Sequence, residues 1–184
     1  MKIWELQENV SEYEHITLVD ASDDEWLALG DMFCGKKLIN DWKPFNMKII
    51  LHDGSLKKSD IPYFSPGIPI FSEEAVNVLQ CLFNNNVEIL DVICDSGAYK
   101  IINVIKVIDG LDHEKSEILT FRCSNRIKAI KKYEFYLNSI TGLHIFKIVE
   151  QSRGAVFVSD EFRNKVIESG LKGFKFIEVW DSND

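Results

Sequence analysis

The chain has 184 residues, of which 46% are hydrophobic, 11% aromatic and 27% charged. With only ten glycines and four prolines the chain cannot be collagen-like or of low complexity, and four cysteines are too few for a disulfide-stapled secreted scaffold. A chain of this length can bury a full apolar core, so we expect one domain spanning residues 1–184.

The net charge of −8 is concentrated at the start of the chain. Residues 1–35 hold nine acidic residues and one basic residue, Lys2, whereas residues 36–184 hold twenty of each. Such a segment can steer a basic partner protein, and it disfavours nucleic acid, whose phosphates need a basic surface. The simpler alternative is a solvated acidic edge that only aids solubility.

Neither a secretion signal nor a membrane span is expected. Residues 1–8 alternate between apolar and polar side chains and carry charge, which is unlike the apolar core of a signal peptide. The richest apolar window, residues 87–108, is interrupted by charged side chains, among them Asp91, Asp95, Lys100 and Lys106, and is therefore unsuited to a bilayer. We expect a cytoplasmic protein whose cysteines are reduced and mostly buried.

The first part of the chain predicts short strands and one short helix. In chain order we expect strands at 3–6 and 16–19 around an acidic stretch at 8–14, a helix at 23–33, a strand at 47–51 that ends in a turn at 52–54, and a loop at 61–67.

Two serine-acid-acid sequences predict helix starts. The hydroxyls of Ser72 and Ser159 can accept hydrogen bonds from the free amides of a first helical turn, and the acidic residues that follow suit the helix dipole. Apolar residues at helical spacing follow both serines. Gly170 is placed to end the second helix in a left-handed conformation.

The second part of the chain predicts more strands than helices. We expect a hairpin of strands 87–94 and 99–108, a second strand pair at 127–137 and 143–149, a strand at 156–158, and a closing strand at 174–180. The predicted fold class is α+β, a mostly antiparallel sheet with two or three short amphipathic helices.

Searches for chemical motifs find none. The chain lacks closely spaced cysteine pairs, the H-x-x-x-H spacing of metal sites, the glycine-rich phosphate loops, and the G-x-S-x-G nucleophile turn. The cluster Asp112-His113-Glu114 is better interpreted as a solvated turn, and Cys34 is the one candidate for a reactive thiol. We therefore assign no catalytic residue, no metal site and no cofactor.

A basic stretch is the main argument for a nucleic-acid partner. Arg122, Arg126, Lys128, Lys131 and Lys132 lie within eleven residues, and aromatic residues follow. Such a combination can bind single-stranded nucleic acid. We favour a solvent-exposed strand face that lies opposite the acidic segment.

The order of several short sequences resembles one known family. These are GKKL at 35–38, DWKP at 41–44, SDIP at 59–62, GIPIFSEEA at 67–75, HIFKI at 144–148, VSDEF at 158–162, GLKGFKF at 170–176 and VW at 179–180. Together they resemble the immunity protein 11 family of bacterial polymorphic-toxin systems.

The resemblance implies a cytoplasmic protein, encoded beside a secreted toxin, that binds the toxin and blocks it without catalysis. Trp42, Gly173, Phe174 and Trp180 match aromatic and glycine landmarks of the family, and we interpret all four as structural. One alternative is an enzyme that reverses the toxin's modification of its target, and another is a nucleic-acid-binding regulator. The oligomeric state is left open.

The acidic segment is the predicted toxin-binding surface, because opposite charges accelerate association and an aromatic side chain ringed by acids suits a binding hot spot. The aromatic candidates are Trp4, Tyr13 and Trp26. The predicted contact residues for a basic toxin are Glu8, Glu12, Tyr13, Glu14, Asp23, Asp24 and Glu25.

Overall fold

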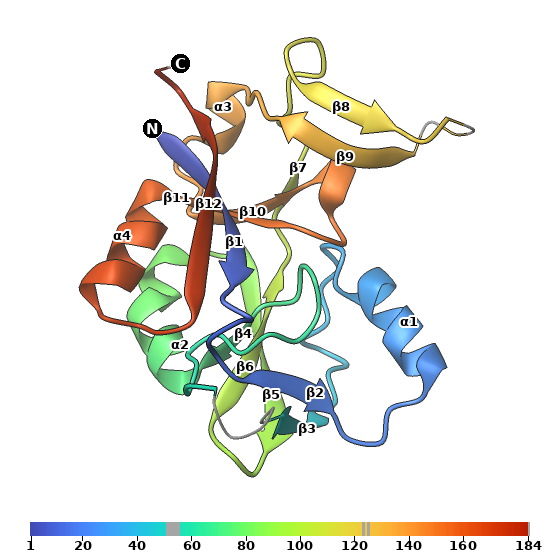
Figure 1. The fold of residues 1–184 in the computed structure, drawn as a ribbon, viewed down its shortest axis with the longest axis vertical. Helices are drawn as coiled ribbons and strands as arrows, with labels where there is room; N and C mark the ends of the chain where they lie inside the picture. Colours follow the sequence, from blue (N-terminus) through green and yellow to red (C-terminus); the bar gives the residue numbers. More distant parts are fainter. Residues whose placement is uncertain (51–55, 123, 125, 184) are drawn as a thin grey trace.

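The strands form two five-stranded sheets and one separate hairpin (Figure 1). The computed structural model describes residues 1–50, 56–122, 124 and 126–183. The first sheet has the order β12 (Phe174–Asp181), β1 (Lys2–Glu8), β11 (Val156–Ser159), β10 (Ile145–Ile148) and β7 (Val107–Ile108). The second has the order β2 (His15–Leu18), β3 (Phe45–Ile50), β5 (Val87–Cys94), β6 (Tyr99–Val104) and β4 (Ile70–Ser72). The hairpin pairs β8 (Glu117–Thr120) with β9 (Ile127–Lys132).

Strand pairing is mostly antiparallel, and the parallel pairs are β3 with β5 and β7 with β10. The helices are α1 (Asp23–Met32), α2 (Glu73–Leu79), α3 (Leu137–Ile140) and α4 (Asp160–Glu168), with 3-10 turns η1 (Gln80–Leu82) and η2 (Val149–Gln151). The predicted α+β class is confirmed, with α3 as an additional single turn. The predicted turn at 52–54 and Cys123 lie outside the described residues.

Both predicted serine caps are confirmed. The Ser72 Oγ accepts a hydrogen bond from the Ala75 amide at 3.1 Å, and the Ser159 Oγ accepts one from the Phe162 amide at 3.2 Å. In each case a short buried strand, β4 or β11, runs directly into the capped helix. Gly170 has a φ of +70° after α4, as its predicted role in ending the helix requires.

The helices α2 and α4 lie side by side against the two sheets (Figure 1). Their buried residues Leu79 and Phe162 share one apolar cluster with Phe71 of β4 and Val158 of β11. Burying these faces stabilises the fold, because each large apolar side chain removed from water contributes about 1.5–3 kcal/mol.

The segment predicted as one strand at 99–108 is two strands in different sheets. The amides of Ile105 and Lys106 both donate to the Asn86 carbonyl oxygen, at 2.9 and 3.1 Å, instead of continuing the β5–β6 pairing. This turn passes the chain from β6 in the second sheet to β7 in the first. The prediction of an uninterrupted strand was wrong because a continuous apolar run does not reveal which sheet buries each part.

The predicted strand pair 127–137 with 143–149 is also wrong. Strand β9 ends at Lys132 and pairs with β8, which the sequence analysis missed, and β10 lies between β11 and β7. Tyr133 and Phe135 are buried in the core beneath β10, so the chain leaves the strand direction after Lys132 and then forms α3. The sequence of β8, EILT, is too short for its pattern to predict a strand.

Segments far apart in the sequence meet at Ser59 and Asp60. The Asp60 carboxylate accepts hydrogen bonds from the Ser72 hydroxyl at 2.7 Å and from the Lys172 amide at 2.8 Å. The Asp60 backbone bonds to the same two residues, through the Ser72 amide and the Lys172 carbonyl. The Ser59 amide donates to Glu14 at 3.1 Å. We call this meeting point the Ser59–Asp60 junction.

Gly173 packs closely against the Ser59–Asp60 junction. Its φ is +89°, and a Cβ atom at this position would lie 2.1 Å from the Ser59 Oγ. Only glycine satisfies both constraints, which explains the predicted structural role of Gly173.

Lys147 in β10 is fully buried, and its Nζ donates to the carbonyl oxygens of Phe33 at 2.6 Å and Ser152 at 2.9 Å. Phe33 is the C-cap of α1, so this lysine joins the end of α1 to the first sheet. Burial lowers the pKa of the Lys147 ammonium to about 8.

We predict that Gly173→Ala destabilises the protein far more than Gly142→Ala. Gly142 also has a positive φ, +77°, but a Cβ there would meet no atom within 4 Å. We expect Gly142→Ala to lower the free energy of unfolding by about 1 kcal/mol, and Gly173→Ala by at least about 2 kcal/mol more. Urea unfolding measures both, and equal losses would contradict a close approach to Ser59.

We further predict that the natural protein becomes more stable relative to the Lys147→Met variant as the pH rises above 8. The quantity compared is the free energy of unfolding. A free lysine keeps its proton to about pH 10.4. The unfolded chain therefore binds more protons than the folded one between these pKa values, and raising the pH favours the folded state by up to about 3 kcal/mol. Urea unfolding of both proteins at pH 7.5 and 10, with a reductant present, measures the difference. Parallel pH profiles would contradict the lowered pKa.

Candidate functional site

The residues that connect β1 to β2, 8–14, are the first part of the predicted acidic surface. The Glu12 carboxylate forms an ion pair with the Lys57 Nζ at 3.0 Å, and this hydrogen bond lowers the Glu12 pKa. The same Nζ lies 5.7 Å from the centre of the Tyr13 ring. Lys57 therefore neutralises the charge of Glu12 and covers Tyr13, although the two segments are more than forty residues apart in the sequence.

Glu14 does not fit the prediction of an exposed contact residue. It is only 8% exposed, and its Oε1 accepts hydrogen bonds from the Ser59 amide at 3.1 Å and the Tyr99 hydroxyl at 2.9 Å. Burial, followed by the hydrogen bond to Glu14, raises the pKa of Tyr99. Glu14 is therefore a structural residue of the Ser59–Asp60 junction.

Glu8 lies at the end of β1 and is partly buried. Together with Glu5 it lines a cavity of about 260 Å³, which Lys175 of β12 also borders. Burial raises the pKa of Glu8 to about 7, and the nearby charge of Glu5 acts in the same direction. Glu8 is therefore only partly ionised near neutral pH, which reduces its contribution to a negative surface.

The first turn of α1 holds the other three predicted acids, and all three are exposed. Ser22 caps the helix, and the Glu25 carboxylate accepts hydrogen bonds from the Ser22 amide at 2.8 Å and the Ser22 hydroxyl at 2.9 Å. These bonds lower the Glu25 pKa, led by the one from the backbone amide. Within the described part of the chain, Asp23 and Asp24 form no ion pair. The first turn of α1 therefore concentrates negative charge. It follows β2 in the chain, whereas the 8–14 connection precedes β2.

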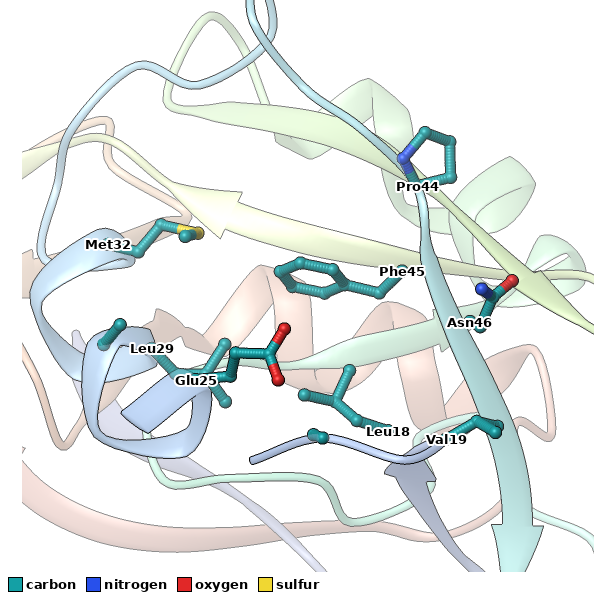
Figure 2. Close-up of a pocket in the computed structure, with 10 residues that line it drawn as sticks. Leu18, Val19, Glu25, Leu29, Met32, Pro44, Phe45 and Asn46 are labelled. Carbon is teal, nitrogen blue, oxygen red and sulfur yellow. The ribbon is translucent and has the colours of Figure 1, made fainter. Parts of the chain in front are cut away.

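An apolar groove of about 340 Å³ lies between α1 and the strands β2 and β3. Figure 2 shows the Glu25 carboxylate directed into this groove, toward Leu18 and the ring of Phe45. The lining residues come from three segments of the chain: Leu18, Val19, Ala21, Glu25, Ala28, Leu29, Met32, Pro44, Phe45 and Asn46. We call this feature the α1 groove.

Comparison with known families identifies the chain. Residues 85–181, which are 97 of the 184, match the family described as Immunity protein family (Imm11). The chain belongs to the Imm11 immunity protein family. This confirms the resemblance noted in the sequence and assigns the protein to toxin immunity. No curated protein matches the chain.

The matched segment of this Imm11 protein begins before β5 and ends with β12. It contains most of the first sheet, the β8–β9 hairpin and α4. The 8–14 connection, α1 and the α1 groove all lie outside the matched segment. The family match therefore gives no support to the predicted contact residues.

The aromatic residues predicted as a hot spot are engaged within the Imm11 protein. The Trp4 indole donates to Asp160 at 2.9 Å, and the Trp26 ring packs on Phe64 at 5.4 Å between ring centres. The most exposed large apolar side chain near the acidic turn is instead Leu27, which is 78% exposed. The sequence analysis missed the α1 groove, since Pro44, Phe45 and Asn46 approach α1 only through the pairing of β3 with β2.

The chemistry available in the described residues is limited. They include no group of His, Cys, Asp and Glu suited to a metal ion, and none of their helices is long and apolar enough to cross a bilayer. His113, which precedes β8, forms a hydrogen bond with Glu150 of η2. Among the described cysteines, Cys81 is exposed and Cys34 and Cys94 are only partly buried, so the prediction of mostly buried cysteines was wrong for all three. The sulfur of Cys34 donates to the Asp31 carbonyl oxygen at 3.2 Å.

We predict that Glu14→Ala destabilises the protein while Glu12→Ala changes its stability little. Removing Glu14 leaves the buried Ser59 amide and the Tyr99 hydroxyl without an acceptor, which lowers the free energy of unfolding by about 2–3 kcal/mol. Glu12 is the matched control, because its ion pair with Lys57 is exposed. Urea unfolding compares the two variants, and similar losses would show that Glu14 is no more structural than its neighbour.

Proposed function

We propose that this Imm11 protein acts in the cytoplasm as the immunity partner of a secreted bacterial toxin. It binds the toxic domain directly and blocks it, with no catalysis of its own. The observation that carries the proposal is an exposed acidic turn beside an open apolar groove, on a member of an immunity family.

The proposed contact surface is narrower than the acidic segment of the sequence. We retain Asp23, Asp24 and Glu25 as the charged centre and add the α1 groove as the apolar part. Glu12 and Tyr13 are assigned to its margin because Lys57 neutralises and covers them, and Glu8 is assigned there because it is only partly ionised. Glu14 is excluded because it is buried.

This surface suits a toxin with a basic face and at least one projecting apolar side chain. Exposed, unpaired carboxylates raise the rate of encounter with a cationic partner. An apolar side chain that enters the groove would be removed from water and would slow dissociation, as the central residues of protein interfaces do.

Co-expression with the toxic domain of the toxin encoded beside it tests the proposal. We expect growth to be rescued and the two proteins to elute together in size-exclusion chromatography. Rescue without a complex would contradict direct blocking and would favour the alternative of an enzyme that reverses the toxin's modification. Absence of rescue would contradict the immunity role itself for this pair.

We predict that Asp23→Lys/Asp24→Lys lowers the association rate for the toxin by at least about tenfold at low salt. The matched control is Glu73→Lys/Glu74→Lys, since these acids occupy the first turn of α2, are exposed, and give the same change of net charge. Surface plasmon resonance at two salt concentrations measures the rates. Equal effects of the two double variants would exclude α1 as the contact.

A further inference from the structure

The β8–β9 hairpin is a basic arm at a distance from the acidic turn of α1. Residues 115–132 hold six basic residues and one acidic residue, a net charge of 6 − 1 = +5. In Figure 1 the hairpin projects beyond both five-stranded sheets, and α1 lies below it on the same side of the molecule. In that view the hairpin is separated from the first turn of α1, whereas the sequence led to the expectation that it lies opposite the acidic segment.

One side of the hairpin is anchored and the other is open. Ile118 and Ile130 pair across the strands and pack against the core cluster that contains Tyr133 and Phe135. On the open side Leu119 is 40% and Phe121 is 51% exposed. The exposed apolar side chains are thus presented on a supported strand pair, where an interaction partner can reach them.

Basic side chains surround these apolar residues. Arg122 and Lys128 line the same shallow hollow as Leu119 and Phe121, and Arg126 lies opposite Phe121, whose amide donates to the Arg126 carbonyl at 3.0 Å. Among the described residues, Arg122, Arg126 and Lys128 are exposed and form no ion pair with a carboxylate. An apolar side chain ringed by unpaired cations is complementary to an acidic surface with an apolar recess.

The α1 groove of the same protein has these properties. Asp23, Asp24 and Glu25 are exposed at one end of it, and its walls are mostly apolar. Its volume of about 340 Å³ exceeds the roughly 150 Å³ of an apolar cavity that holds benzene, so the ring of Phe121 has room to enter.

We propose that two copies of this protein form a two-fold dimer in which the β8–β9 hairpin of each copy docks into the α1 groove of the other. Phe121 enters the groove, while Arg122, Arg126 and Lys128 face Asp23, Asp24 and Glu25. The hairpin and α1 both lie on the right of the molecule in Figure 1, as a two-fold dimer with two equivalent contacts would need.

Such a dimer covers the surface assigned above to the toxin. Resting on the proposed function, we infer that toxin and second copy compete, so that the free protein is dimeric and the complex contains one immunity protein. Dimerisation is measured without any toxin, so a failure of this inference leaves the immunity proposal intact.

Sedimentation velocity on the full chain tests the dimer, with a reductant present because Cys81 is exposed. We expect a concentration-dependent dimer whose dissociation constant rises at least about tenfold with Phe121→Ala, and similarly on raising the salt from about 0.05 to 0.5 M. Glu73→Lys/Glu74→Lys is the control that leaves the dimer unchanged. A monomer at all concentrations overturns the proposal.

A charge exchange gives the decisive result. Asp23→Lys/Asp24→Lys and Arg126→Asp/Lys128→Asp each place like charges at both contacts, so each variant alone is expected to be monomeric. In an equimolar mixture, one contact pairs the natural basic hairpin with the natural acidic turn. The other pairs the acidic variant hairpin with the basic variant turn. Both contacts are then attractive, so a mixed dimer should form. Two folded variants, verified by circular dichroism, that fail to combine would overturn the pairing. So would a dimer that disappears on nuclease treatment, because the hairpin would then be holding nucleic acid.

Discussion

The hydrogen bonds of the Ser59–Asp60 junction are the constraint on which the rest of the structure depends. Through them one short segment holds the 8–14 connection, the start of α2 and the turn before β12, which are distributed between residues 8 and 173 of the sequence. A buried carboxylate that loses one such partner keeps its desolvation penalty, so the energies of these contacts are coupled. Gly173 is required there because its neighbour approaches too closely for any side chain.

The junction also decides which acidic residues remain available to a partner. It buries Glu14 and brings Lys57 to Glu12, so neither carboxylate is an exposed and unpaired charge of the 8–14 connection. The first turn of α1 receives no such basic neighbour among the described residues. The C-terminal end of α1 is held by the hydrogen bond from the Lys147 ammonium to the Phe33 carbonyl, and the α1 groove runs along the helix from Glu25 to Met32.

Some charges of this protein are paired within the molecule, as Glu12 is with Lys57, whereas the acids in the first turn of α1 form no ion pair among the described residues. The acidic turn of α1 and the basic β8–β9 hairpin are separate in space, and neither is neutralised by the other. A surface that attracts a basic toxin also attracts any basic, apolar arm, including one on a second copy. In our proposals the toxin and the second copy compete because both would be recognised by that shared chemistry.

The sequence by itself determined the α+β class, the two serine-capped helices, the left-handed Gly170 and the family, because these depend on local capping chemistry, periodicity and short motifs. It could not determine that residues 99–108 serve two sheets, that β9 pairs with β8, or that Glu14 is buried. Nor could it separate Glu12 from Asp23, since both are acidic residues in a polar stretch and differ only in whether a distant lysine reaches them. Strand partners, burial and ion pairs are contacts between residues far apart in the chain, so only the tertiary structure decided them.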